Sequence, residues 1–299
     1  AAGISELREG IAKKLLEENG LSYDPKQICV TSGGKQACMN AIMAMCDEGD
    51  EVIIPAPYWV SYPEMVRLCG AEPVIVETSE ENGWKMTAEQ FEEAMTPKTK
   101  MVIINTPGNP TGAVYTEEEL RAIGEVASYE DIMILSDEIY EKLIYGDHKH
   151  VSIASISEEL KSLTVVCHGF AKAYSMTGWR IGYTAAPPEM AAAIAKIQSH
   201  TTSNVTTFAQ YGALAALSGS QDFVEDMRSE YDVRRQFVQA RLSAIPNISV
   251  QDPGGAFYFF VNCEPLGLKS QNLCDKLLTR YKVAAVPGIA FGHNSSLRL

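Results

Sequence analysis

A lysine and an arginine stand eight residues apart in Gly169–Gly182, which reads GFAKAYSMTGWRIG. The β-rich run Leu163–Val166 precedes this stretch, so we expect Lys172 to lie on the loop that leaves a buried strand. Burial and nearby cations lower the pKa of a lysine and make its amine a better nucleophile toward carbonyl groups. Arg180 offers a planar fork of N–H donors that suits a phosphate. The pair therefore indicates a ligand that carries both an aldehyde and a phosphate.

Pyridoxal 5′-phosphate (PLP) is such a ligand, and its chemistry sets further requirements for the rest of the chain. Its ring acts as an electron sink while the ring nitrogen stays protonated, which calls for a buried carboxylate partner. Asp137 follows the very apolar predicted strand Ile132–Leu135 and is the candidate. Ser136 and Asp137 also favour helix caps, so a capping role is the alternative. Without such partners, Lys172 and Arg180 read as an ordinary loop lysine and a surface arginine.

The other edges of a PLP ring need contacts as well. Tyr140 and Asn109 can supply donors for the phenolic oxygen, and Trp59 can stack on the ring face. Both aromatic residues have core packing as the alternative. An amino-acid substrate requires a carboxylate clamp, and an arginine binds a carboxylate with two hydrogen bonds. Arg298 is the candidate for this clamp, with a surface arginine as the alternative.

A glycine turn is a second candidate for binding the phosphate. The predicted strand Ile28–Thr31 leads into Ser32–Lys35, and a helix is predicted over Ala37–Met45. Strand, glycine turn and helix in this order aim backbone N–H groups at an anion. The spacing is not that of a Walker A motif, and an ordinary structural turn is the alternative. Ser175 or Thr177 would add a hydroxyl group to the phosphate site.

Short apolar strands alternate with helices along the first part of the chain. The predicted strands are Ile28–Thr31, Glu51–Ile54, Pro73–Val76, Met101–Asn105, Ile132–Leu135 and Leu163–Val166. This alternation predicts an α/β fold with a mostly parallel sheet and helices on both faces. In such sheets, ligands bind beyond the carboxyl ends of the strands. Nearly all the polar clusters follow strands, so we expect them to form one site.

The pattern of predicted helices and strands changes toward the C-terminus. A long charged helix is predicted over Phe223–Leu242, and strands are predicted at Ser249–Val250 and Ala256–Val261. These elements indicate a smaller α+β lobe. We therefore expect a large domain at residues 1–230 and a small domain at residues 231–299.

Composition limits the class of protein. The chain has 299 residues, of which 46% are hydrophobic and 21% charged, as in an ordinary globular enzyme. Its net charge of −13 argues against nucleic acid or an anionic membrane as a partner. Seven cysteines without a CxxC pair indicate reduced thiols and a cytoplasmic protein. A plastid location is compatible if a transit peptide has been removed, and no metal site is predicted.

The chain resembles the class I aminotransferases of the aspartate aminotransferase family, which have PLP fold type I. The stretches NPTG, SDEIY and GFAKAYSMTGWRIG carry the resemblance, which runs over essentially all 299 residues. SGGKQA and PYWVSYPEM are similar to the bacterial and plastid subgroup called I-beta. Members usually carry extra residues at both ends, so the resemblance implies a PLP-dependent transferase fold that is incomplete at both ends, and a homodimer.

The resemblance also implies roles for the residues that match its motifs. Lys172 is the Schiff-base lysine and the proton shuttle, and Asp137 pairs with the pyridinium nitrogen. Tyr140 and Asn109 bond the ring oxygen, and Trp59 stacks on the ring and borders the substrate.

Further implied roles concern the phosphate and the substrate. Gly34, Ser175 and Arg180 lie around the phosphate. Arg298 holds the α-carboxylate of the substrate, and Lys35 reaches its distal carboxylate.

Two residues depart from the subgroup pattern. Ala171 stands where serine is frequent, and His168 stands where asparagine is usual. We expect tuning and not loss of activity. His168 is either an additional titrating group or a histidine whose polar atoms are satisfied at the end of a strand.

The resulting prediction is PLP-dependent transamination between a dicarboxylic amino acid, aspartate or glutamate, and a 2-oxo acid such as 2-oxoglutarate. Alternatives are a prephenate or aromatic aminotransferase, or another PLP reaction on the same fold, such as a C–S lyase, racemase or decarboxylase. Two further alternatives are the ligand-sensing domain of a regulator and an α/β domain that binds another phosphate ligand.

Overall fold

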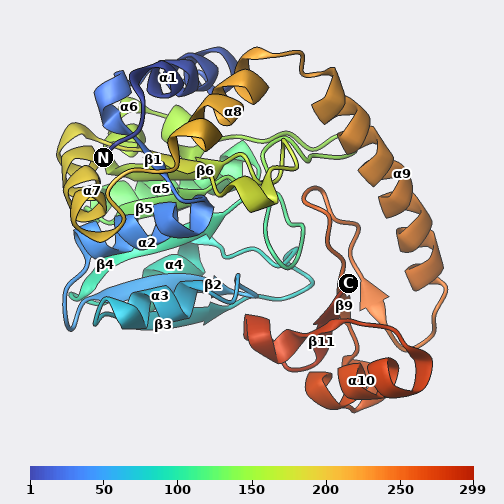
Figure 1. Cartoon of the computed structure of the whole chain (residues 1–299). Coiled ribbons are helices and arrows are strands. Elements are labelled where there is room, and N and C mark those ends of the chain that lie inside the picture. The colour runs from blue at the N-terminus through green and yellow to red at the C-terminus, as the bar shows by residue number, and fades with distance from the viewer.

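The computed structural model describes residues 1–299 and contains two β-sheets (Figure 1). The larger sheet has seven strands in the order β1–β7–β6–β5–β4–β2–β3. Its strands are β1 (Ile28–Thr31), β2 (Glu51–Ala56), β3 (Glu72–Glu77), β4 (Thr99–Asn105), β5 (Met133–Asp137), β6 (Thr164–Gly169) and β7 (Gly182–Ala185). Strands β2 to β6 are paired in parallel, whereas β7 is antiparallel to both β6 and β1. The predicted mostly parallel α/β sheet is confirmed.

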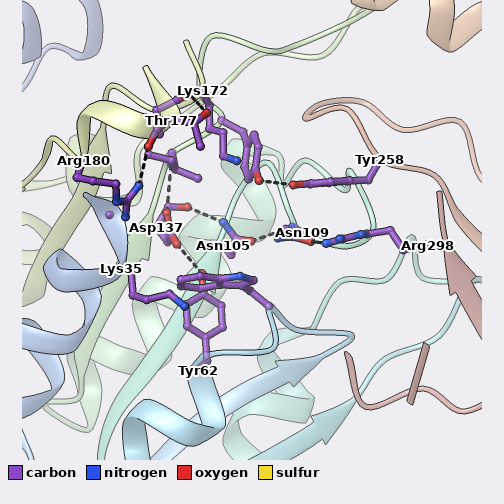
Figure 2. Close-up of a pocket in the computed structure, with 15 residues that line it drawn as sticks. Lys35, Tyr62, Asn105, Asn109, Asp137, Lys172, Thr177, Arg180, Tyr258 and Arg298 are labelled. Carbon is purple, nitrogen blue, oxygen red and sulfur yellow. Dashed lines mark hydrogen bonds between the residues drawn. The ribbon is translucent and has the colours of Figure 1, made fainter. Parts of the chain in front are cut away.

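The register of the central strands brings polar residues to one edge of this sheet. Asn105 at the end of β4 lies beside Asp137 at the end of β5, and Asp137 lies beside Cys167 of β6. These carboxyl ends border the region that Figure 2 enlarges. The sheet therefore gathers residues that are far apart in the sequence.

Helices cover both faces of the larger sheet. They are α1 (Ser5–Asn19), α2 (Gly34–Met45), α3 (Tyr62–Leu68), α4 (Ala88–Ala94), α5 (Glu117–Tyr129), α6 (Glu158–Leu163), α7 (Pro188–Thr201) and α8 (Thr207–Ser218). Residues of α2, α3 and α7 share one core cluster with one face of the strands. The opposite face packs against α4, α5 and α6 and, around β1 and β7, against α1 and α8.

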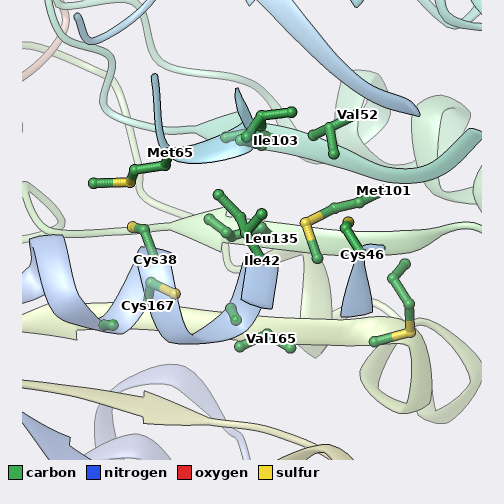
Figure 3. Packing of buried hydrophobic residues seen from close by; sticks show 14 of the residues in the cluster. Cys38, Ile42, Cys46, Val52, Met65, Met101, Ile103, Leu135, Val165 and Cys167 are labelled. Atoms are coloured by element: carbon green, nitrogen blue, oxygen red, sulfur yellow. The ribbon is translucent and has the colours of Figure 1, made fainter. Parts of the chain in front are cut away.

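Alternation along the strands explains this two-sided core. Leu135 of β5 lies in the cluster beneath α2, whereas its neighbour Ile134 belongs to the cluster on the opposite face. Figure 3 shows Leu135 and Val165 close to Ile42 and Cys38 of α2. A strand that is buried on both faces reads as an uninterrupted apolar run, which is how these strands are recognised in the sequence.

The smaller sheet has the order β10–β11–β9–β8, with all neighbours antiparallel. Its strands are β8 (Ser249–Val250), β9 (Phe260–Asn262), β10 (Val286–Pro287) and β11 (Ser296–Arg298), with α10 (Ser270–Lys276) packed nearby. The long helix α9 (Asp222–Ser243) leads along the outside of the molecule to this sheet (Figure 1). The proposed division between residues 230 and 231 falls within α9 and remains a proposal.

Two predicted elements differ from the structure. Helix α2 begins at Gly34, three residues before the predicted start, so the glycine turn is partly helical. The predicted strand Ala256–Val261 is wrong at its start, because only β9 (Phe260–Asn262) is extended and paired. Ala256 has a φ of 58°, and its N–H donates to the carbonyl of Leu143, which bends the segment away from the sheet.

One close backbone contact shapes the glycine turn before α2. A Cβ added at Gly182 would lie 2.4 Å from the carbonyl carbon of Gly33, so no side chain fits there. Gly33 itself has a φ of 86°, which favours glycine. These glycines allow the turn before α2 to lie directly against Gly182, the first residue of β7, which comes two residues after Arg180. No helix combines the length and apolar character needed to cross a membrane.

Candidate active site

A pocket with a volume of about 280 Å³ lies beyond the carboxyl ends of the central strands (Figure 2). Its lining residues are Gly34, Lys35, Trp59, Tyr62, Asn105, Asn109, Asp137, Ile139, Tyr140, Ala171, Lys172, Thr177, Arg180, Tyr258 and Arg298. Nine of the ten site residues predicted from the sequence are among them. The structure thus brings the amine, the carboxylate and the arginines of the sequence analysis to a single cavity.

The carboxylate of Asp137 lies at the bottom of the pocket, and only 6% of the residue is exposed. The hydroxyl of Tyr62 donates to Oδ2 at 2.6 Å, and the thiol of Cys38 lies 3.7 Å from the same oxygen. The N–H of Ile139 donates to Oδ1 at 3.2 Å. This last bond is the local capping interaction that the sequence offers as an alternative, so Asp137 caps the turn and also faces the pocket.

Burial raises the pKa of Asp137, and the donors from Tyr62 and Ile139 and the nearby His168 oppose that rise. A carboxylate of this kind gains most from a cation placed beside it, because an opposite charge favours the ionised form and lowers the pKa. The site is therefore chemically suited to a protonated ring nitrogen.

Lys172 is half-buried on the loop after β6, and its Nζ lies 5.6 Å from the ring centroid of Tyr140. Burial lowers the pKa of Lys172, the positive charges of Arg298 and Arg180 lower it further, and Asp137 opposes them. The amine is consequently neutral, and nucleophilic, over a wider pH range than that of a solvated lysine.

Arg180 and the beginning of α2 form the side of the pocket that suits a phosphate. The guanidinium donates from Nη1 to the carbonyl of Thr177 at 3.0 Å, and Nη2 lies 3.4 Å from the carbonyl of Ser32. A Cβ at Gly33 would lie 2.4 Å from Nη2, so the guanidinium packs directly over the glycine turn. Gly34 begins a helix of 12 residues whose N-terminal N–H groups attract an anion.

Ser175 does not line this pocket, although it borders a second cavity together with Ser32 and Arg180. Its φ is 52°, and its hydroxyl contacts the sulfur of Met227 at 3.1 Å. Thr177, the alternative to Ser175 in the sequence analysis, lines the pocket instead. The tight turn at Ser175 directs the two side chains to different surroundings, which the order of residues does not reveal.

Hydrogen bonds connect Arg298 of the smaller sheet to the backbone of Asp137. Arg298 Nη1 donates to Asn109 Oδ1 at 2.8 Å, and the Asn109 N–H donates to Asn105 Oδ1 at 2.9 Å. Asn105 Nδ2 then donates to the carbonyl oxygen of Asp137 at 2.9 Å. The guanidinium also stacks on Tyr258, with its carbon 4.4 Å from the ring centroid. These contacts fix Arg298 at the mouth of the pocket.

Tyr258 also positions Tyr140, because the two hydroxyl groups lie 2.8 Å apart. Burial and the neighbouring Tyr258 raise the pKa of Tyr140, so its hydroxyl stays protonated and can donate.

Lys35 approaches the pocket from the opposite side to Arg298 in Figure 2. Its Nζ lies 5.0 Å from the ring centroid of Trp59, which in turn meets Tyr62 edge to face at 5.2 Å. Lys35, Lys172, Arg180 and Arg298 are the cations that line the pocket, and Asp137 is its only carboxylate. In a chain with a net charge of −13, this concentration of cations indicates a small ligand with several negative charges.

Sequence reasoning missed Tyr62, Asn105 and Tyr258 as site residues. Tyr62 is the first residue of α3, three positions after Trp59, and Tyr258 lies between two phenylalanines. Either aromatic residue reads as core in the sequence. Only Asn105 carried a signal, since it is the last residue of a predicted strand.

Comparison with known proteins agrees with this geometry. The family model described as "Aminotransferase class I and II" matches residues 1–299. An aspartate aminotransferase of Geobacillus stearothermophilus is 49% identical, and a probable aspartate/prephenate aminotransferase of Aquifex aeolicus is 50% identical. Each alignment covers 100% of this chain and 77% of the relative.

Solved structures give the same result. The aspartate aminotransferase of Rhizobium meliloti has a TM-score of 0.97 at 38% identity, and that of Thermus thermophilus with maleate has 0.95 at 43%. Both comparisons cover 100% of this chain and 77% of the other. The chain therefore belongs to the aminotransferase class I and II family, and it is an aminotransferase with the fold of the PLP-dependent transferases.

Replacing Tyr62 with phenylalanine removes a donor from the buried carboxylate of Asp137 and raises its pKa further. We expect the apo-protein to lose about 2 kcal/mol of unfolding free energy at neutral pH, where Asp137 is ionised in the unfolded chain. The loss should shrink toward about pH 4, where protonation of Asp137 makes the missing donor less important.

Urea unfolding of both proteins across this pH range measures the difference. Tyr115→Phe is the matched control, because the Tyr115 hydroxyl bonds only the Met86 N–H and its loss should not vary with pH. If the loss of unfolding free energy in Tyr62→Phe were equally independent of pH, the assignment of Tyr62 as a donor to the Asp137 carboxylate would be contradicted.

Proposed function

We propose that this chain catalyses PLP-dependent transamination between a dicarboxylic amino acid, aspartate or glutamate, and a 2-oxo acid such as 2-oxoglutarate. The observation that carries the proposal is that the Lys172 amine and the buried Asp137 carboxylate line the same 280 Å³ cavity. Arg180 and the N-terminal end of α2 lie at a third side of that cavity.

The residues of the pocket fit PLP when tested group by group. The buried acid has a raised pKa and suits a ring nitrogen that carries a proton. The amine has a lowered pKa and suits an aldehyde. Arg180 beside the glycine turn suits the phosphate, and Tyr140 and Asn109 offer donors for the ring oxygen. When bound, PLP supplies an electron sink that acidifies the α-carbon of an amino acid.

The chain's own residues then have distinct tasks. Lys172 would hold the cofactor, and its Nζ would remove the proton from the substrate α-carbon as a general base. The lowered pKa of Lys172 suits this task because the neutral amine is the reactive form. Asp137 keeps the ring nitrogen protonated, and Arg298 orients the substrate by its α-carboxylate.

Two cations at opposite sides of the pocket support a dicarboxylic substrate. Arg298 is held by Asn109 and Tyr258, and Lys35 lies over Trp59 on the other side. The relatives named aspartate aminotransferase, and the Thermus thermophilus structure with maleate, agree with this choice. An aspartate/prephenate or aromatic specificity is the second candidate, favoured by the Aquifex aeolicus relative and by an aromatic aminotransferase structure from Pyrococcus horikoshii at 40% identity.

An exposed aromatic surface beside the phosphate side supports a homodimer. Phe208 is 76% exposed and Trp179 49% exposed, and both border a second cavity that includes Arg180. Such a surface is typical of a protein interface. The seven cysteines are all free, which supports the proposed cytoplasmic location.

Replacing Lys172 with alanine should abolish covalent PLP binding and transamination of aspartate. Purified protein incubated with PLP should show an absorbance band near the visible range, and the variant should lack it. Lys161→Ala is the control, because Lys161 pairs with Glu158 outside the pocket and should leave both signals unchanged. Turnover of aspartate by a folded Lys172→Ala protein would refute the role of the lysine.

Replacing Lys35 with alanine should raise the KM for aspartate about tenfold or more and change that for phenylalanine little. The reason is that only aspartate offers a second carboxylate to this cation. Steady-state kinetics with both amino acids test the split, with Lys26→Ala as the surface control. An equal effect on both substrates would contradict the proposed contact between Lys35 and the distal carboxylate of aspartate.

Replacing Phe208 with glutamate should convert a dimer into a monomer in sedimentation experiments at micromolar concentration, because it places a charge in the apolar surface. Phe223→Glu is the matched control, since Phe223 is 56% exposed on α9 and does not border this surface. A wild-type protein that sediments as a monomer would contradict the proposed homodimer.

A further inference from the structure

A buried polar network lies behind the active site and is not used by the proposed mechanism. Lys14 and Asn19 of α1 both contact Glu141, which follows Tyr140 directly. Lys14 is 7% exposed and Glu141 8%. His168, at the end of β6, is 4% exposed, and its Nε2 lies 3.1 Å from Glu141 Oε1. The network thus joins the first helix to two strand ends that border the pocket.

The hydrogen bonds of His168 fix both its orientation and its tautomer. The N–H of Gly169 donates to Nδ1 at 2.7 Å, so Nδ1 is an acceptor without a proton. The ring proton is therefore on Nε2, which lies 3.1 Å from Glu141 Oε1 in a close polar contact. Tyr183 stacks on the imidazole with ring centroids 5.3 Å apart and planes inclined by 16°. All three contacts hold the ring in one place.

The sequence positions of this pair give the contact its significance. Glu141 comes four residues after Asp137, and His168 comes four residues before Lys172. Beyond the last register pair, Asp137 with Cys167, the backbone adds only the Glu138 N–H bond to the Cys167 carbonyl. The His168–Glu141 contact then continues the link between the two segments that carry the acid and the amine.

Charge balance explains why Glu141 can serve as the anchor. Burial opposes its charge, but Lys14 and then His168 outweigh burial and hold the pKa of Glu141 well below its usual range. Asn19 donates to the other carboxylate oxygen at 3.0 Å. Its neighbour Glu138 is bonded by Ser136, Ser152 and His150. The Nε2 atom of His150 also lies 3.9 Å from Glu141 Oε2, so His150 adds to the positive surroundings of Glu141.

We propose that His168 is a positioning residue of this aminotransferase, held by Gly169 and Glu141 so that it sets the Lys172 amine relative to the Asp137 carboxylate. The proposal rests on the proposed function, since it concerns the geometry of the PLP site. It bears on the question that the sequence leaves open for His168, whose Nδ1 accepts from Gly169 and whose Nε2 faces Glu141.

The test compares four purified single variants and one double variant with the wild-type holoenzyme. His168→Ala removes the hydrogen bond from Gly169 and the contact with Glu141, and His168→Asn keeps an acceptor for the Gly169 N–H but loses the contact with Glu141. Glu141→Gln removes the anchoring charge. Glu117→Gln is the control, because Glu117 pairs with Arg121 on the exposed surface of α5 and contacts no member of the network.

We expect His168→Ala to lower kcat with aspartate roughly ten- to a hundredfold, because small displacements of reacting groups are costly. The KM should change less than about twofold, since Lys35 and Arg298 are untouched. The kcat of His168→Asn should lie between that of the wild-type protein and that of His168→Ala. His168→Ala combined with Glu141→Gln should lose no more than His168→Ala alone, since both changes break one contact.

Two further readouts separate positioning from mere loss of stability. The acid limb of the kcat–pH profile should shift in His168→Ala, because a displaced Lys172 amine changes its distance from Asp137, which raises its pKa, and from Arg298 and Arg180, which lower it. The rate of covalent PLP uptake by the apo-protein, followed by absorbance, should fall along with kcat. If His168→Ala does not fold, the same two readouts on His168→Asn decide the question.

The possible outcomes distinguish failure of the positioning role from failure of the proposed function. Variants at His168 that keep kcat within twofold, with an unshifted acid limb and normal PLP uptake, would overturn the proposal while leaving the aminotransferase function intact. Additive losses in the double variant would overturn it as well. If instead the wild-type protein takes up no PLP at Lys172, the proposed function fails, and this proposal fails with it for a distinguishable reason.

Discussion

A carboxylate buried at the end of the central strand is the feature on which the pocket depends. Burying a charge away from water is costly unless donors or cations surround it, and Asp137 has donors from Tyr62 and Ile139 but no ion-pair partner in the protein. The cavity next to it carries Lys172 and Arg180 and the beginning of a helix. An acidic chain thus concentrates positive potential in one place, where a multiply charged anion can bind.

The sheet order makes this concentration possible. Strand β5 occupies the middle of the larger sheet, so its carboxyl end is bordered by the ends of β4 and β6. The loops that follow β4 and β6 supply Asn109 and Lys172, and α2 supplies Gly34 from one face. Arg298 comes from the smaller sheet, and the bonds through Asn109 and Asn105 tie it to the backbone of Asp137. A shift of the smaller sheet would therefore change substrate binding and the region around the acid together.

Much of this arrangement can be predicted from the sequence. The apolar runs identify six strands, of which only the edge strand β3 is largely exposed. The capping box of Thr116 and Glu119 marks the start of α5. The short strand β7 cannot be identified in this way, because four residues that include a glycine give no periodicity. Likewise, Ser175 looks equivalent to Thr177 until the left-handed turn at Ser175 directs its hydroxyl to Met227.

The residues that support the reacting groups are the least predictable. Tyr62 and His168 act through contacts with residues far along the chain, and such pairings depend on tertiary packing and not on local pattern. The roles of Tyr62 and His168 can be inferred only from interatomic distances in the folded protein and from the tautomer of His168.

Borohydride reduction of the PLP-treated protein, followed by peptide mapping, tests the central claim most directly. The account predicts one pyridoxyl group per chain, attached to Lys172, and none when phosphate and maleate together fill the pocket first. Stable attachment at Lys35 or a surface lysine, with Lys172 unmodified, would contradict it.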